Sequence, residues 1–139
     1  MKQKVKVVFD ANIYLSAIIF GGNPRQCLEL AKKGDIELFT SNAILLEVAR
    51  NLQNKFGWSA EEVKEVIKGI GEFAILVSPQ VIVKVIQTYP KDNKILEAAQ
   101  EAKAEYIISG DKKHLLSLKK FKNIEIISAK DFLDLYYEN

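Results

Sequence analysis

The stretch that decides the fold is Val5-Lys6-Val7-Val8-Phe9-Asp10-Ala11-Asn12, near the start of the chain. Val7, Val8 and Phe9 form an apolar run without polar alternation, which indicates a central strand covered on both faces. Asp10 ends this run, and the residues after it have helical composition. A strand that leads directly into a helix is typical of open α/β sheets, in which ligands bind at the carboxyl ends of the strands.

The bulk properties of the chain indicate one ordinary globular domain. Its 139 residues are the usual length of a single domain, expected to span 1–139, and 48% of them are hydrophobic. The net charge of +2 neither requires nor excludes a nucleic-acid partner. With Cys27 as the single cysteine, and no apolar run of ~20 residues, we expect a cytoplasmic protein without membrane association.

Strand-like and helix-like segments alternate along the rest of the chain. The expected strands are 5–9, 36–39, 73–77, 106–109 and 124–127, with helical patterns between them and after the last. This alternation predicts an α/β fold, a three-layer α/β/α sandwich with a central, mostly parallel sheet and right-handed crossovers. The segment Val81–Ile86 has strand composition but also fits a helical turn, and both readings stay open.

Helix ends are signalled by their capping residues. Ser59 is a good N-cap and Glu62 stands at the capping-box position, so a helix should begin there. Gly34 and Gly57 follow helical patterns and should end them, and Ser128 should cap the last helix. A short helix is expected over 112–118.

Several carboxylates have unusual settings. Asp10 ends the first strand, and Asp111 follows the strand at 106–109 after a glycine. Parallel strands bring such ends to one sheet edge, so these two carboxylates should be neighbours. Asp92 opens a helix just upstream, and Glu47 interrupts the apolar stretch 43–49.

Each of these acids also has a plain structural explanation. Asp92 could serve only as a helix N-cap, and Asp111 could cap the short helix after it. Glu47 could pair with Arg50 across one helical turn. Convergence favours a functional site, because clustered carboxylates repel one another unless a cation lies among them. Hard ions such as Mg²⁺ or Mn²⁺ prefer oxygen ligands and suit phosphodiester hydrolysis.

The order and spacing of four short motifs resemble the PIN-domain ribonucleases, a family that includes VapC-type toxins of toxin–antitoxin pairs. The resemblance runs from Val5 to about Leu135. The motifs are Phe9-Asp10-Ala11-Asn12, Ser41-x-x-x-Leu45-x-Glu47-Val48, Asp92-Asn93-Lys94-Ile95-Leu96-x-x-Ala99 and Ile107-Ile108-Ser109-Gly110-Asp111.

The resemblance implies an endoribonuclease that depends on Mg²⁺ or Mn²⁺ and hydrolyses RNA. It implies that Asp10, Glu47, Asp92 and Asp111 are the catalytic metal ligands, directly or through water. Asn12 and Ser109 match polar positions that hold the carboxylates or waters in place. It further suggests a homodimer and a small antitoxin protein as partner.

The chain departs from the family pattern at one position. Many relatives carry a further acid two residues after the position of Asp111, where this chain has Lys113. The resemblance therefore leaves open whether the site holds one metal ion or two.

Basic residues gather in sequence after Asp111. The cluster contains Lys112, Lys113, Lys119, Lys120 and Lys122, of which the first four are the candidate RNA contacts. Either it contacts RNA phosphates beside the site, which would make binding salt-dependent, or it is a solvated face. His114 stands among these lysines with no nucleophile at a matching spacing, so a surface role is favoured.

Two other functions compete with the nuclease. A magnesium-dependent phosphatase or phosphotransfer domain would use Asp10 as nucleophile. Phosphatases of the haloacid dehalogenase type, however, have a second Asp two residues after the nucleophile, where this chain has Asn12. A non-catalytic RNA- or protein-binding module on the same fold would be expected to lack part of the acidic quartet. All four acids are present, which favours the enzyme.

Overall fold

The computed structural model describes residues 3–80, 90–111 and 115–138, and for Pro90, Lys91 and Asp92 it describes the backbone alone. Helices and strands alternate, as the sequence predicts. The elements are β1 (Lys6–Phe9), α1 (Ala11–Ile19), α2 (Gly22–Lys32), β2 (Glu37–Thr40), α3 (Asn42–Asn54), α4 (Ala60–Gly71), β3 (Ile75–Leu76), α5 (Pro90–Ala102), β4 (Tyr106–Ile108), α6 (Leu115–Leu118), β5 (Lys120–Phe121), β6 (Ile124–Ile127) and α7 (Ala129–Glu138).

One six-stranded sheet, in the order β3-β2-β1-β4-β6-β5, organises the molecule. All neighbouring strands are parallel except β5 and β6. Val8 of β1 lies opposite Phe39 of β2 and Ile107 of β4. This register brings the carboxyl ends of the three strands to one edge of the sheet, which we call the carboxyl edge; the opposite edge is the amino edge.

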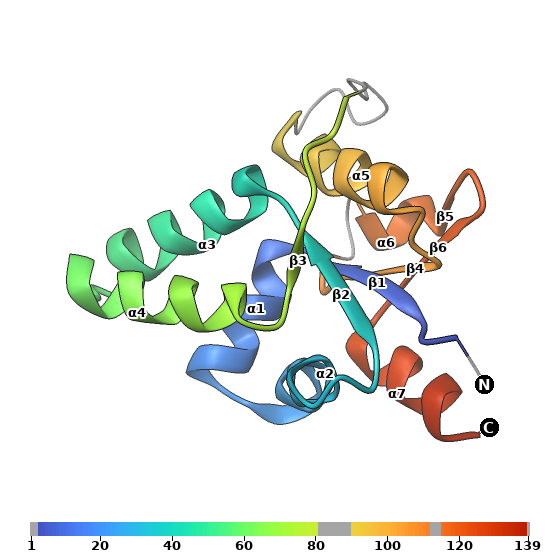
Figure 1. Ribbon diagram of the computed structural model, residues 1–139, viewed down its shortest axis with the longest axis horizontal. Helices are drawn as coiled ribbons and strands as arrows, with labels where there is room; N and C mark the ends of the chain where they lie inside the picture. Colours follow the sequence, from blue (N-terminus) through green and yellow to red (C-terminus); the bar gives the residue numbers. More distant parts are fainter. Residues whose placement is uncertain (1–2, 81–89, 112–114, 139) are drawn as a thin grey trace.

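Helices cover both faces of the sheet, so the expected three-layer α/β/α architecture is confirmed. In Figure 1, α5 lies on one side of the sheet, and α2 and α7 lie on the other. Helices α3 and α4 extend side by side away from the sheet (Figure 1). Within the described residues, no helix has both the length and the apolar character to cross a membrane.

Local signals in the sequence explain where several helices begin and end. Ser59 and Glu62 form the expected capping box at the start of α4. Gly57 adopts φ +70° just after α3, a conformation that costs glycine little, and Ser128 Oγ accepts the Asp131 N–H at 3.1 Å. Arg25 donates to the Ala17 carbonyl at 2.8 Å, so its guanidinium satisfies the end of α1.

Some expected elements differ in extent from those observed. The strand expected at 73–77 contains only Ile75–Leu76, because this outermost strand pairs with β2 alone. The two-residue β5 is an addition, too short to leave a sequence pattern. The expected helix at 112–118 is described over Leu115–Leu118, and 112–114 as well as Val81–Ile86 lie outside the described residues.

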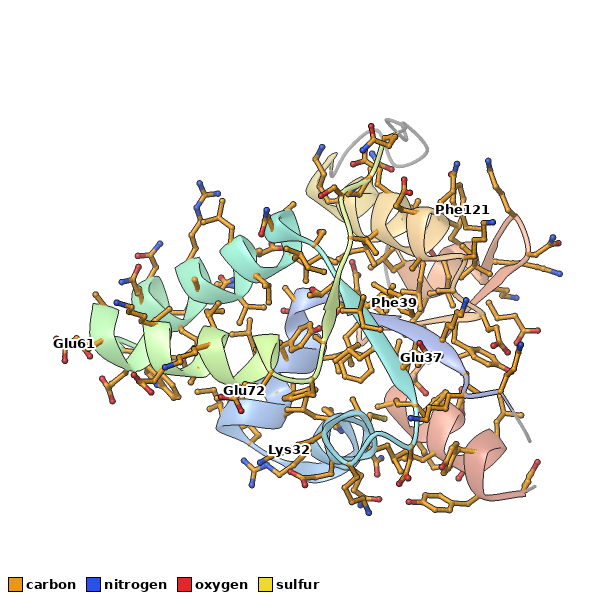
Figure 2. All side chains as sticks on the ribbon, in the orientation of Figure 1. Lys32, Glu37, Phe39, Glu61, Glu72 and Phe121 are labelled. Carbon is orange, nitrogen blue, oxygen red and sulfur yellow. The ribbon has the colours of Figure 1, made fainter. Side chains whose placement is uncertain are left out.

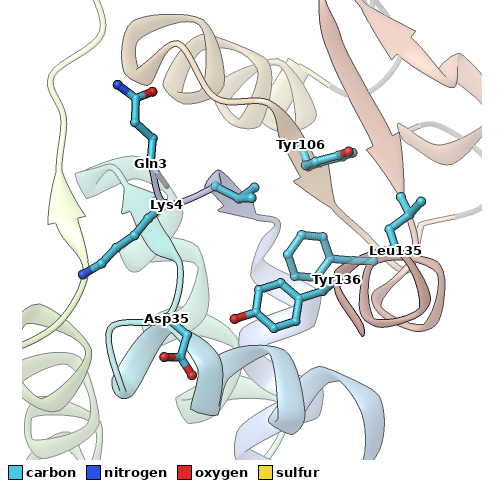
Figure 3. Close-up of a pocket in the computed structure, with 8 residues that line it drawn as sticks. Gln3, Lys4, Asp35, Tyr106, Leu135 and Tyr136 are labelled. Carbon is cyan, nitrogen blue, oxygen red and sulfur yellow. The ribbon is translucent and has the colours of Figure 1, made fainter. Parts of the chain in front are cut away.

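Charged side chains surround the outside of the molecule (Figure 2). The amino edge opens onto a pocket of about 480 Å³, with Lys4 and Asp35 at one side and the rings of Tyr106 and Tyr136 at the other (Figure 3). Phe132 also lines it and packs edge-to-face on Tyr106, with ring centroids 5.7 Å apart. This end of the sheet is therefore aromatic.

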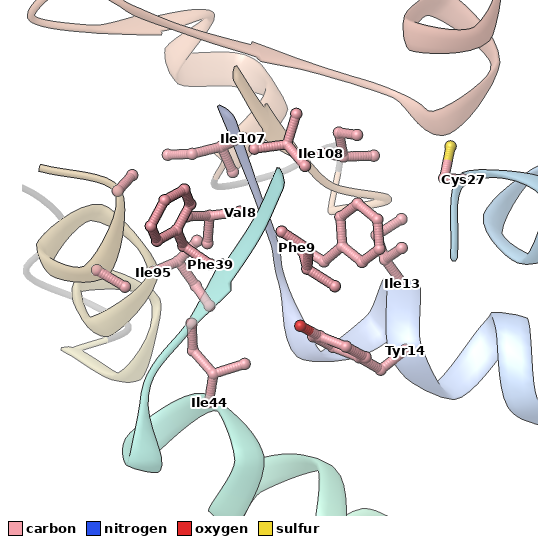
Figure 4. Packing of buried hydrophobic residues seen from close by; sticks show 14 of the residues in the cluster. Val8, Phe9, Ile13, Tyr14, Cys27, Phe39, Ile44, Ile95, Ile107 and Ile108 are labelled. Atoms are coloured by element: carbon pink, nitrogen blue, oxygen red, sulfur yellow. The ribbon is translucent and has the colours of Figure 1, made fainter. Parts of the chain in front are cut away.

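The apolar core fills the space between the sheet and its helices. Val8, Phe9 and Ile107 of the central strands are fully buried. In Figure 4, Ile95 of α5 approaches the sheet from one side, and Ile13 and Tyr14 of α1 lie beside Phe9. Because the central strands are covered on both faces, their apolar run shows no alternation, as predicted.

Candidate active site at the carboxyl edge

Asp10 follows directly after β1 and is fixed by several contacts. Its side chain is only 4% exposed, and its Oδ1 accepts the Ile13 N–H at 3.0 Å, which makes Asp10 the N-cap of α1. Its own N–H donates to the Ile108 carbonyl at 3.0 Å and so ties it to β4. Asp10 thus holds a buried carboxylate at the positive end of a helix, where a negative charge is favoured.

Ser109 connects Asp10 to the neighbouring strand end. The fully buried Ser109 hydroxyl donates to Asp10 Oδ2 and accepts the Asp111 N–H at 2.9 Å. Both carboxylate oxygens of Asp10 therefore have protein donors. The sequence-based expectation gave Ser109 the task of holding a carboxylate in place, and this contact agrees with it.

Asp111 lies at the same edge, two residues beyond Ser109. It is half-buried, and its carbonyl accepts the Leu116 N–H at 2.8 Å, which ties it to the start of α6. The backbone bond to Ser109 brings Asp111 close to Asp10, as parallel pairing of β1 and β4 predicts.

Glu47 lies in the second turn of α3, which begins just after β2. Its side chain is half-buried, and it lines a groove of about 500 Å³ between α3 and α5. The alternative explanation, an ion pair with Arg50, is not seen. Within the described ranges, ion pairs join Lys33 to Asp35, Lys94 to Glu97 and Lys130 to Asp134, and none joins Arg50 to Glu47.

The remaining predicted residues are described in part. Asp92 lies within the first turn of α5, not before it, but its side chain is outside the described residues. Asn12 is exposed in the first turn of α1. Lys112 and Lys113 lie outside the described residues. Exposed Lys120 is on the edge strand β5, opposite Glu125, and exposed Lys119 immediately precedes it.

Further polar residues are buried at or near this edge, and of these the sequence assigned a role only to Ser41, as a possible N-cap. Thr40 is the last residue of β2 and Ser41 follows it at the same edge, where Ser41 is the N-cap of α3. Asn93 and Glu97 are 5% and 6% exposed on α5. Glu97 could have been found, because it interrupts the apolar run from Ile95 to Ala99 just as Glu47 interrupts its own.

These donors suit a hard cation in their chemistry. Asp10, Glu47 and Asp111 offer carboxylate oxygens, and one of these groups is almost fully buried, where a cation stabilises it most. Among the described side chains, which do not include that of Asp92, no three acidic, histidine or cysteine groups lie close enough to hold a metal ion.

Comparison with known proteins identifies the family. The sequence pattern of the PIN domain matches residues 6–113, which include every member of the acidic quartet. The chain belongs to the PIN-domain family. PIN domains are generally nucleases that use divalent metal ions, and the family includes toxins of toxin–antitoxin pairs.

Relatives of this PIN domain are distant but span nearly its whole length. Uncharacterized protein MJ1680 of Methanocaldococcus jannaschii is 30% identical over 146 residues, covering 96% of this chain and 92% of the relative. VapBC2 from Rickettsia felis, bound to a DNA fragment from their promoter, matches with a TM-score of 0.64 at 15% identity, over 88% of this chain and 97% of that chain. PAE2754 from Pyrobaculum aerophilum matches with a TM-score of 0.64 at 13% identity, over 97% and 91% of the two chains. At these identities the structural matches show the fold.

Proposed function

We propose that this PIN domain is an endoribonuclease that needs Mg²⁺ or Mn²⁺ and hydrolyses RNA phosphodiester bonds at the carboxyl edge. The observation that carries the proposal is the buried Asp10 carboxylate, bonded through Ser109 to the backbone of Asp111. Burying a charge is unfavourable unless it is compensated, so a structure that fixes one beside a second acid is suited to cation binding.

Asp10, Glu47, Asp92 and Asp111 would hold the cation, directly or through water. Such a cation neutralises charge on the phosphodiester and favours the ionisation of water for hydrolysis. Ser109 and the N-terminus of α1 keep the Asp10 carboxylate in one orientation before any substrate arrives. Asn12, exposed in the first turn of α1, would contact water or substrate at the rim.

The same proposal includes the partners, the oligomeric state and the cellular compartment of the protein. The structural match to VapBC2 supports a small antitoxin as a partner, and the family supports a homodimer acting in the cytoplasm. Lys112, Lys113, Lys119 and Lys120 would contact RNA outside the site. Replacing Lys119 and Lys120 with Ala should flatten the salt dependence of RNA binding, and an unchanged slope would assign both lysines to ordinary surface.

A cleavage assay tests the proposed function. Purified protein would be incubated with a panel of single-stranded and structured RNAs in Mg²⁺, in Mn²⁺ and in a chelator. We expect cleavage that requires the metal. Cleavage that continues in chelator would contradict the metal-dependent mechanism, and binding of RNA without cleavage in either metal would favour the non-catalytic binding module.

A further inference from the structure

Glu47 lines a groove between α3 and α5, together with residues of α3 on either side of it. The volume of this groove is about 500 Å³, within the range typical of small-ligand sites. The groove is lined by Ala43, Ile44, Leu46, Glu47, Arg50, Asn51, Asn54, Lys94 and Ile95.

Two cations flank this groove from opposite walls. Arg50 is exposed on α3, one turn beyond Glu47, and in the described part of the chain it forms no ion pair. Lys94 stands on α5, with a side chain that is 50% exposed. A polyanion entering the groove would therefore meet a positive charge on each side.

Lys94 is held in position by a buried carboxylate. Its Nζ lies 3.3 Å from Glu97 Oε1, and the Glu97 side chain is only 7% exposed. An ammonium group has three N–H donors, so this contact leaves Lys94 able to donate to a phosphate. A half-exposed lysine anchored from below by a buried acid is more restricted than an ordinary surface lysine.

The rest of the lining suits a nucleic-acid strand. Leu46 is 50% exposed at the groove and offers an apolar surface to a sugar or base. Asn51 Nδ2 donates to the Glu47 carbonyl at 3.0 Å. Asn54 lies seven residues beyond Glu47, about 10 Å along the helix axis at 1.5 Å per residue. The polar residues thus continue for two helical turns from the site.

We propose that the α3–α5 groove binds the single-stranded RNA segment next to the scissile phosphate, with Arg50 and Lys94 contacting its phosphates. This proposal rests on the proposed nuclease function, because that function is what places the scissile phosphate next to Glu47. Charge favours a polyanion over an apolar peptide, because Arg50 and Lys94 stand on facing walls. The proposed RNA-cleaving site, which Glu47 shares with this groove, favours an RNA strand over an acidic peptide. Since phosphate contacts position a strand without reading it, these contacts should be insensitive to sequence.

The test is equilibrium binding of a fluorescent single-stranded RNA oligomer in chelator, where cleavage does not interfere, at several salt concentrations. Each phosphate contact on a single strand contributes about 0.7 to the slope of log affinity against log salt. The double variant Arg50→Gln with Lys94→Gln should therefore bind more weakly, with a slope smaller by about 1.4. Arg50→Gln alone keeps the ion pair of Lys94 with Glu97, and should reduce the slope by about 0.7.

A matched control removes the same charge at the other end of the sheet. Lys32→Gln with Lys33→Gln lies at the end of α2, near the amino ends of the strands. Figure 2 places Lys32 on the side of the sheet away from α5. This variant should keep the parent slope.

The experiments distinguish a wrong groove proposal from a wrong nuclease proposal. A slope equal to the parent's in both groove variants would overturn the groove proposal, whether or not the protein cleaves RNA, and would leave the groove to a protein partner. A slope reduced in the groove variants, in a protein that cleaves no RNA in Mg²⁺ or Mn²⁺, would support the groove and contradict the nuclease. Equal loss in the Lys32 and Lys33 control would show a general charge effect and also overturn the proposal.

Discussion

At its carboxyl edge the sheet buries Asp10, Ser41 and Ser109, whereas its amino edge is lined by Tyr106 and Tyr136. Both edges open onto hollows of nearly equal size, about 500 Å³ beside Glu47 and about 480 Å³ at the amino edge. Size therefore does not separate them. The difference lies in which groups the fold removes from water.

Burial of polar groups is unfavourable without compensating contacts, so a fold that gathers them needs a reason to do so. The buried polar side chains of the described residues are Asp10, Thr40, Ser41, Asn93, Glu97 and Ser109. Three of these directly follow β1, β2 or β4 at the carboxyl edge, Thr40 is the last residue of β2, and the other two are on α5. The amino edge instead carries aromatic contacts, edge-to-face between Tyr106 and Phe132 and stacked between Phe132 and Tyr136, which need no ligand.

The largest expected effect comes from the centre of the polar edge. Asp10→Asn should lower metal-dependent RNA cleavage by at least about 100-fold, because even contacts that merely orient a ligand contribute 10- to 100-fold. The fold should survive, since Asn is as good an N-cap as Asp for the Ile13 N–H. Cleavage rates and thermal unfolding check the two parts.

The matched change at the aromatic edge is Tyr136→Phe, which keeps the ring and removes the hydroxyl. It should leave cleavage unchanged. If Tyr136→Phe reduced cleavage as much as Asp10→Asn, the functional distinction between the two edges would be wrong.

A smaller effect is expected from Ser109→Ala. This change removes the donor to Asp10 Oδ2 and the acceptor of the Asp111 N–H. Cleavage should fall by about 10- to 100-fold, as for other groups that orient metal ligands, and the free energy of unfolding by about 1–3 kcal/mol. Unchanged cleavage in a folded Ser109→Ala protein would show that the hydroxyl serves stability alone.

The smallest effect concerns Tyr14, whose hydroxyl is buried beside the polar edge. By distance and angle neither it nor the Thr40 hydroxyl has a hydrogen-bond partner among the described residues, although Thr40 lies near enough to oppose the effect of burial on the Tyr14 pKa. Tyr14→Phe should therefore change stability at pH 7 by no more than about 1 kcal/mol. Burial raises the pKa of Tyr14 in the folded state above the unfolded value of about 10. The folded protein thus keeps a proton that the unfolded chain releases, and stability should fall as pH rises above about 10.

Tyr136 provides the comparison for this pH dependence. Its pKa is also raised, first by burial and then by Asp35, but Tyr14 is the more deeply buried. The free energy of unfolding should fall less at high pH in Tyr14→Phe than in Tyr136→Phe. Denaturant unfolding between pH 8 and about 11 measures this difference. If the stability of Tyr14→Phe fell with rising pH as steeply as that of the parent, Tyr14 would not be the source of this pH dependence.

The sequence predicted the fold well because its signals are local. The unbroken apolar run at Val7–Phe9, the capping box at Ser59 and the cap at Ser128 each act within a few residues. Parallel pairing of β1 with β4 then brought Asp10 to the same edge as Asp111, and Ser109 bonds to both. The two-residue strand β5 escaped prediction because it exists through pairing with β6 alone.

The site was harder to predict where it depends on contacts between distant segments. Ser109 could be named from the motif, but its simultaneous bonds to Asp10 and Asp111 depend on the pairing of β4 with β1. No role was assigned to Lys94 or Glu97 from the sequence, because an i,i+3 ion pair on a helix is usually exposed to solvent. Only the burial of Glu97 separates this pair from an ordinary one.

The most direct test of the central claim is a calorimetric titration of Mn²⁺ into the parent protein and into Asp10→Asn, without RNA. A cation site at the carboxyl edge predicts saturable binding by the parent and an affinity at least about tenfold weaker in the variant. The Tyr136→Phe protein, altered at the aromatic edge, should bind as the parent does. Equal Mn²⁺ affinity in the parent and Asp10→Asn would contradict a metal centre built on Asp10.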